Sequence, residues 1–98
     1  MPEVRFRVRW PDRSLSECYS PSSVVKDFFA AGASYDLADF LQRARRALDA
    51  ASERVRLKYG WACSRAHDQL AEIEATAERY ARLKDPRVTL EAFEEEPR

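Results

Sequence analysis

The segment Asp36–Tyr59, DLADFLQRARRALDAASERVRLKY, has apolar residues at intervals of three and four, the pattern of one long amphipathic helix. Its acidic first turn and basic last turn suit the dipole of one continuous α-helix. About 24 residues rise about 36 Å, whereas a domain of this length has a radius of gyration of only about 13 Å. We therefore expect this helix to project from the domain or to pack along a partner. Its apolar stripe consists of Leu37, Phe40, Leu41, Ala44, Leu48, Ala51, Val55 and Tyr59.

A second long helix is predicted from about Ser64 to Leu83. Its apolar residues have the spacing that packs against one facing helix, and alanines on both stripes allow a close approach. We expect an antiparallel pair in which Gly60 supplies the left-handed residue that ends the first helix. Trp61 is expected to pack near Val55, and Ser64 to cap the second helix. The second stripe consists of Ala66, Leu70, Ile73, Ala77 and Tyr80.

The N-terminal residues predict a β-hairpin. Residues 4–10, VRFRVRW, alternate strictly between apolar and charged side chains, as in a half-buried strand. A proline–aspartate turn signal follows, and residues 15–20 alternate as a return strand. A loop of this kind favours glycine at its left-handed position, where Arg13 stands instead, so the turn type stays open. The outer face of the first strand would carry Arg5, Arg7 and Arg9.

Two shorter elements complete the prediction. The run SPSS at residues 20–23 indicates the start of a short helix over residues 24–31, which Gly32 ends. Residues 88–93 alternate again and are a candidate third strand that adds to the edge of the hairpin. Its two faces would consist of Val88, Leu90 and Ala92 on one side and Thr89, Glu91 and Phe93 on the other.

We therefore predict a single α+β domain over residues 1–93, followed by a flexible acidic tail at residues 94–98. The hairpin and the candidate third strand would pack on two long antiparallel helices and one short helix. The 98 residues are 45% apolar and 35% charged, which is typical of a soluble globular protein. No apolar run approaches the roughly 20 residues of a membrane span, and the N-terminus lacks the apolar core of a signal peptide. We expect a cytoplasmic protein without membrane contact.

The formal net charge is zero, but cations predominate in residues 1–65 and carboxylates in residues 66–98. Packing within one chain or between two copies can neutralise this imbalance. A neutral chain argues against nucleic-acid binding, for which a basic excess is usual. The arginines of the first strand nevertheless leave a small nucleic-acid-binding regulator open as an alternative.

The junction between the long helices contains Cys63 and His67, a candidate nucleophile and general base. A thiol at a helix N-terminus near a cationic histidine can have a lowered pKa. A cysteine just outside a helix and a histidine inside its first turn need not face each other, and nothing in the sequence supplies an oxyanion hole. We favour a structural junction over a catalytic one, so a thiol-dependent enzyme stays an alternative.

Metal and cofactor sites are not expected. A structural zinc site needs four cysteine or histidine ligands, and the chain has only Cys18, Cys63 and His67. Its two glycines, Gly32 and Gly60, both stand at predicted helix ends, so no glycine-rich phosphate loop is present.

Four segments, VRWPD, CYSPSSVVKDFF, ASERVRLKYGWACSRA and DQLAEIEATAERY, carry a family resemblance. Their order and spacing resemble a family of small bacterial nitrogen-starvation response proteins encoded in gene clusters with a nitrilase. The resemblance covers about residues 1–83. The family favours glycine after the proline–aspartate pair, and Arg13 departs from that pattern.

The resemblance implies a role in scavenging nitrogen from nitriles or cyanide, but no reaction that can be assigned to particular residues. The small core, the overlong amphipathic helix and the lack of an assembled catalytic set lead us to expect a non-catalytic accessory protein that forms a homodimer. The resemblance adds products of the nitrilase gene cluster as its partners. Among the positions in the matching segments, the candidate binding residues are Lys26, Arg54, Lys58 and Tyr59, of which the three cations would bind an anion if they converge.

Overall fold

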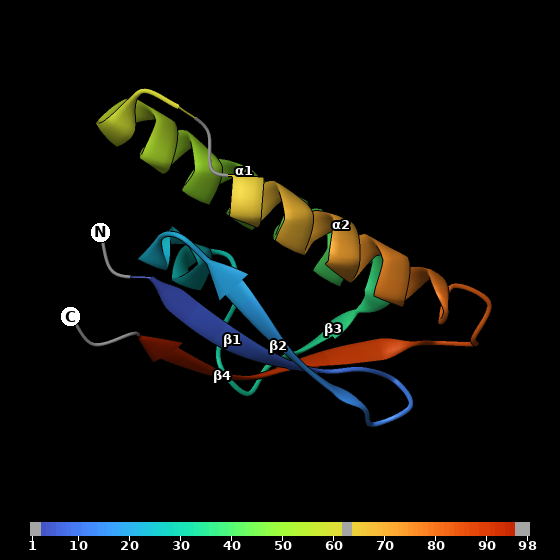
Figure 1. The fold of residues 1–98 in the computed structure, drawn as a ribbon. Helices are drawn as coiled ribbons and strands as arrows, with labels where there is room; N and C mark the ends of the chain where they lie inside the picture. The colour runs from blue at the N-terminus through green and yellow to red at the C-terminus, as the bar shows by residue number, and fades with distance from the viewer. Residues whose placement is uncertain (1–2, 62–63, 96–98) are drawn as a thin grey trace.

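The chain folds into two layers, a four-stranded antiparallel sheet and a pair of helices that covers one of its faces (Figure 1). This computed structural model describes residues 3–61 and 64–95. The predicted α+β fold, with its N-terminal hairpin, C-terminal strand and antiparallel helix pair, is confirmed. The elements are β1 (Val4–Arg9), β2 (Leu15–Ser20), η1 (Ser23–Asp27), β3 (Ser34–Asp36), α1 (Leu37–Tyr59), α2 (Ser64–Glu78) and β4 (Arg87–Glu95).

The strand order is β2-β1-β4-β3, so β1 and β4 are the inner strands. The strict alternation of β1 has the predicted effect, since its apolar side chains are buried beneath the helices and its arginines are exposed. The candidate third strand, β4, does pair with the hairpin through β1, but β3 pairs with its other edge. The three-residue strand β3 was not predicted, because so short a segment has no readable periodicity.

A β-bulge interrupts the pairing of β1 with β4. Arg7 pairs with Ala92 but Val8 pairs with Leu90, which leaves one extra residue on β4. The strictly alternating faces predicted for residues 88–93 are therefore wrong beyond the bulge. Leu90 is fully buried, Ala92 is exposed, and Phe93 turns to the core side with its ring 6.4 Å from that of Phe6.

The predicted start of the flexible tail is also wrong. Glu94 and Glu95 belong to β4 and pair with the beginning of β1. The carboxylate of Glu95 also accepts a 2.8 Å hydrogen bond from the ammonium of Lys26 on η1. Residues 96–98 lie outside the described part of the chain.

Two of the predicted helices, over residues 24–31 and over residues 64–83, are shorter in the structure than expected. The helix predicted over residues 24–31 is the 3₁₀-helix η1, capped by Ser22, which accepts a hydrogen bond from the backbone N–H of Val24. The helix predicted to end at Leu83 ends at Glu78. From there the backbone forms tighter turns with hydrogen bonds to the third residue back, which brings the ring of Tyr80 into a 5.7 Å stack with Trp10.

Aromatic rings fill the space between the sheet and α1. Phe40 of α1 is fully buried, and its ring lies 5.6 Å from Trp10 and 5.3 Å from Phe29. The indole N–H of Trp10 donates a 2.9 Å hydrogen bond to the hydroxyl of Ser16, so this polar group is satisfied. The edge strand β2 is tied to α2, because the side-chain oxygen of Gln69 accepts a hydrogen bond from the backbone N–H of Tyr19.

We predict that Arg13→Gly stabilises the protein. Arg13 has a φ of 72°, the left-handed conformation expected for this position of the loop. A side chain in this region costs about 1–2 kcal/mol, partly offset by the larger backbone entropy that glycine loses on folding. We expect a gain of about 0.5–1 kcal/mol in the free energy of unfolding, measured by urea denaturation. Arg13→Ala keeps the strain and serves as control, so an equal gain in that variant would contradict the explanation.

Candidate functional site

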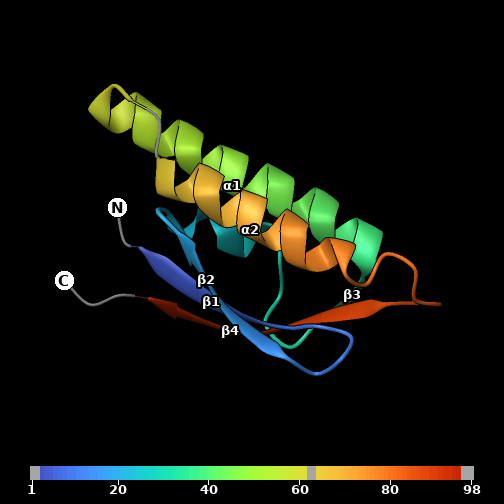
Figure 2. The same cartoon turned by 45° about the vertical axis from the view of Figure 1, so that its right-hand side comes forward.

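The last turns of α1 project beyond the rest of the domain. Figure 2 shows α1 continuing past the start of α2. Ala51 is the last fully buried residue of the helix, and most of the residues that follow are exposed. The helix ends as predicted, with the backbone N–H of Gly60 donating to the carbonyl of Arg56 and a φ of 89° at Gly60. We refer to residues 53–61 as the α1 tip.

Three large apolar side chains of the α1 tip face solvent. Leu57 is 73% exposed, Trp61 is 69% exposed and Tyr59 is 48% exposed. The sequence predicts Trp61 near Val55; after the left-handed turn at Gly60 its indole lies largely at the surface, 6.4 Å from the ring of Tyr59. The tip is therefore an apolar surface that the domain itself does not cover.

The candidate binding residues divide between two places. Arg54 and Lys58 lie one helical turn apart on the α1 tip, and the ammonium of Lys58 lies 5.5 Å from the ring of Tyr59. Lys26 instead binds Glu95 at the end of β4, in the opposite layer from the tip (Figure 1). The structure thus brings Arg54, Lys58 and Tyr59 together, while the ammonium of Lys26 is already paired with a carboxylate.

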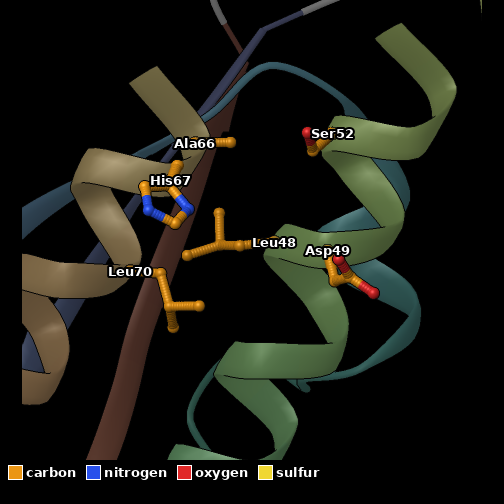
Figure 3. A pocket seen from close by; sticks show the side chains of 6 residues that line it. All are labelled: Leu48, Asp49, Ser52, Ala66, His67 and Leu70. Carbon is orange, nitrogen blue, oxygen red and sulfur yellow. The ribbon is translucent and has the colours of Figure 1, made fainter. Parts of the chain in front are cut away.

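A small pocket separates α1 from α2 near the junction, with a volume of about 70 Å³. It is lined by Leu48, Asp49, Ser52, Ala66, His67 and Leu70. Figure 3 shows the imidazole of His67 beside Leu48, while the carboxylate of Asp49 is directed away from it. Small-molecule sites usually have about 300–1,000 Å³, so this pocket has room for a few water molecules at most.

The serine, histidine and aspartate of this pocket are the residue types of a catalytic triad, but their geometry is not that of one. Among the residues that the structure describes, no hydrogen bond joins Asp49, Ser52 and His67. Cys63 lies outside the described residues, so the alternative in which Cys63 is a nucleophile and His67 its base stays untested. Sequence reasoning did not select Asp49 or Ser52, because neither lies on the apolar stripe of α1.

The other cysteine, Cys18, is buried beneath α2 at 2% exposure. Burial raises the pKa of its thiol to about 12, and the carboxylates of Glu72 and Glu17 act in the same direction. The thiol therefore stays protonated and inert at neutral pH.

The burial of Cys18 predicts that its thiol reacts with labelling reagents only after the protein unfolds. In a Cys63→Ser variant, which isolates Cys18, we expect almost no reaction with Ellman's reagent at pH 8 in the native state. One equivalent should react after unfolding in guanidinium chloride. Rapid labelling of the native variant would show that Cys18 is more accessible than its position in β2 implies.

The arginine face of β1 is paired with carboxylates. Arg7 binds Glu17 of β2 at 2.8 Å, and Arg9 binds Glu91 of β4 at 2.7 Å. Charges neutralised in this way attract a phosphate backbone weakly, which lowers the support for the nucleic-acid alternative.

Over residues 3–61 and 64–95, no group of three histidine, cysteine or acidic side chains is placed to hold a metal ion. No helix in the same part of the chain is long and apolar enough to span a membrane.

Comparison with protein families gives one decisive observation: the model of the family described as nitrogen starvation-induced protein NitG matches residues 5–93. This range runs from β1 into β4. The chain belongs to the NitG family. No curated protein and no solved structure matched the chain.

The NitG match includes the α1 tip, the interhelical pocket and every candidate residue named from the sequence. It confirms the resemblance to nitrogen-starvation proteins and supports a role in that response. Of the residues at the NitG α1 tip, Leu57 was not selected from the sequence. Its signal is an apolar side chain on the face of the helix opposite the buried stripe.

Proposed function

We propose that this NitG protein is a non-catalytic accessory protein that acts in the nitrogen-starvation response by binding other proteins. The observation that carries the proposal is the α1 tip, where Leu57 and Trp61 are held in solvent at the end of a projecting helix. Exposed aromatic and apolar side chains on a rigid element are the usual anchors of protein interfaces.

The pocket between the helices supports the same reading. Its volume of about 70 Å³ is small for a substrate, and its polar groups do not converge on one point. A binding role needs only a complementary surface, which the tip offers. In this proposal the chain contributes contacts to an assembly.

We further propose that its partners are proteins of a nitrilase gene cluster, in a pathway that scavenges nitrogen from nitriles or cyanide. The support is the resemblance carried by segments such as CYSPSSVVKDFF, together with the nitrogen-starvation description of the matching family.

Affinity capture tests this role. The tagged full-length chain is expected to recover nitrilase-cluster proteins from nitrogen-starved cells and to recover none of them from cells grown on ammonium. Purified nitrilase mixed with the chain should then co-elute with it in size-exclusion chromatography. Failure to recover any cluster product from starved cells would contradict the proposal.

A further inference from the structure

On the α1 tip, two cationic side chains lie next to an apolar one. Arg54, Leu57 and Lys58 stand at positions i, i+3 and i+4, which share one face of a helix. All three are exposed. Within the described ranges neither Arg54 nor Lys58 has a salt-bridge partner. Among the described residues, the tip therefore presents two cations without a carboxylate partner beside a large apolar side chain.

The outer side of α2 shows the opposite pattern. Asp68, Ala71, Glu72 and Ala75 stand at positions i, i+3, i+4 and i+7, and all four are exposed. In the part of the chain that the structure describes, neither carboxylate has a salt-bridge partner. The two alanines are small and exposed, so no bulky side chain of α2 stands between the carboxylates and an incoming residue such as Leu57.

The two faces are largely complementary in charge and in size. The tip offers cations around a large side chain, and α2 offers two carboxylates beside two alanines. Arg65 borders the same carboxylates, but its guanidinium is held over the ring of Tyr19 and near Glu3. Two tips facing each other would instead bring like charges together, which is unfavourable at an interface. The zero net charge of the chain means that no overall repulsion keeps two copies apart.

We propose that the α1 tip docks on the outer face of α2 in a second copy of this chain. A two-fold axis makes the contact twice, with each copy giving its tip and receiving its partner's. A standard interface of roughly 1,600 Å² requires roughly 400 Å² on each of four patches, which are one tip and one α2 face on each copy. Trp61 and Tyr59 provide large aromatic area beside the charged stripe. This inference rests on the proposed interaction role and names one of its partners.

Charge exchange between the two faces tests the arrangement. One variant carries Arg54→Glu and Lys58→Glu, and the other carries Asp68→Lys and Glu72→Lys. Each variant alone presents like charges at both contacts, so we expect its dimer dissociation constant to rise about tenfold or more. An equimolar mixture restores opposite charges at both contacts, and light scattering should then report a heterodimer of twice the 11.4 kDa chain mass.

The matched control is Arg46→Glu, an exposed reversal on the same helix outside the tip, which should leave the dimer unchanged. Circular dichroism checks that every variant folds.

A wild-type chain that stays monomeric up to about 200 µM would overturn the proposal. If that monomer then pelleted with anionic phosphatidylglycerol vesicles, the tip would be a lipid-binding surface instead. A dimer insensitive to both reversals would overturn it equally. Neither result bears on capture of nitrilase-cluster proteins, so the two proposals fail separately.

Discussion

Phe40→Ala is expected to destabilise the protein by about 3–5 kcal/mol, the usual cost of removing a buried phenylalanine. Phe40 has no exposed surface and joins α1 to the sheet through ring contacts with Trp10 and Phe29. Truncation removes both contacts and leaves a cavity between rigid elements that cannot close over it. Domains of this size have a total stability of about 5–15 kcal/mol, so much of the margin would be lost.

Urea denaturation followed by circular dichroism measures this effect. The control is Leu57→Ala on the same helix, where the side chain is 73% exposed and the expected change is within about 0.5 kcal/mol. Equal losses in the two variants would mean that α1 does not pack on the sheet through Phe40.

The parts of the fold that the sequence predicts are those whose periodicity is long and uninterrupted. Strand β1 alternates without a break, and α1 keeps one apolar stripe over six turns. The structure departs from the sequence prediction where distant contacts decide the geometry. Strand β3 exists because residues 34–36 pair with residues 87–89 of β4, far away in the sequence. The early end of α2 likewise accompanies the stack of Tyr80 on Trp10.

The candidate site was likewise predicted only where local spacing determines it. Arg54 and Lys58 are neighbours through helical spacing, which the sequence shows directly. The pairing of Lys26 with Glu95 joins η1 to the end of a strand, which local spacing cannot reveal. The exposure of Trp61 follows from the direction in which the chain leaves Gly60, and several directions satisfy the same residue pattern.

Leu90→Asp is expected to unfold the protein at neutral pH. Leu90 is fully buried on inner strand β4, and its backbone bonds to Gly32 and Ala33 of the neighbouring edge. An aspartate there would place an unpaired carboxylate among apolar side chains, at a cost of more than about 4 kcal/mol. The expected result is loss of the cooperative thermal transition and of dispersed amide signals in the NMR spectrum.

Ala92→Asp on the same strand separates this explanation from a general effect of charge on β4. If the strand alternated strictly, Leu90 and Ala92 would share a face, and aspartate would be equally damaging at both. The bulge instead turns Ala92 to the open face beside Arg7, where a carboxylate is solvated and the expected change is within about 0.5 kcal/mol. Phe93→Ala should then cost about 1–2 kcal/mol, because its ring packs towards Phe6 on the core side. A damaging Ala92→Asp together with a neutral Phe93→Ala would place the bulge elsewhere, and with it the face of β4 that covers the core.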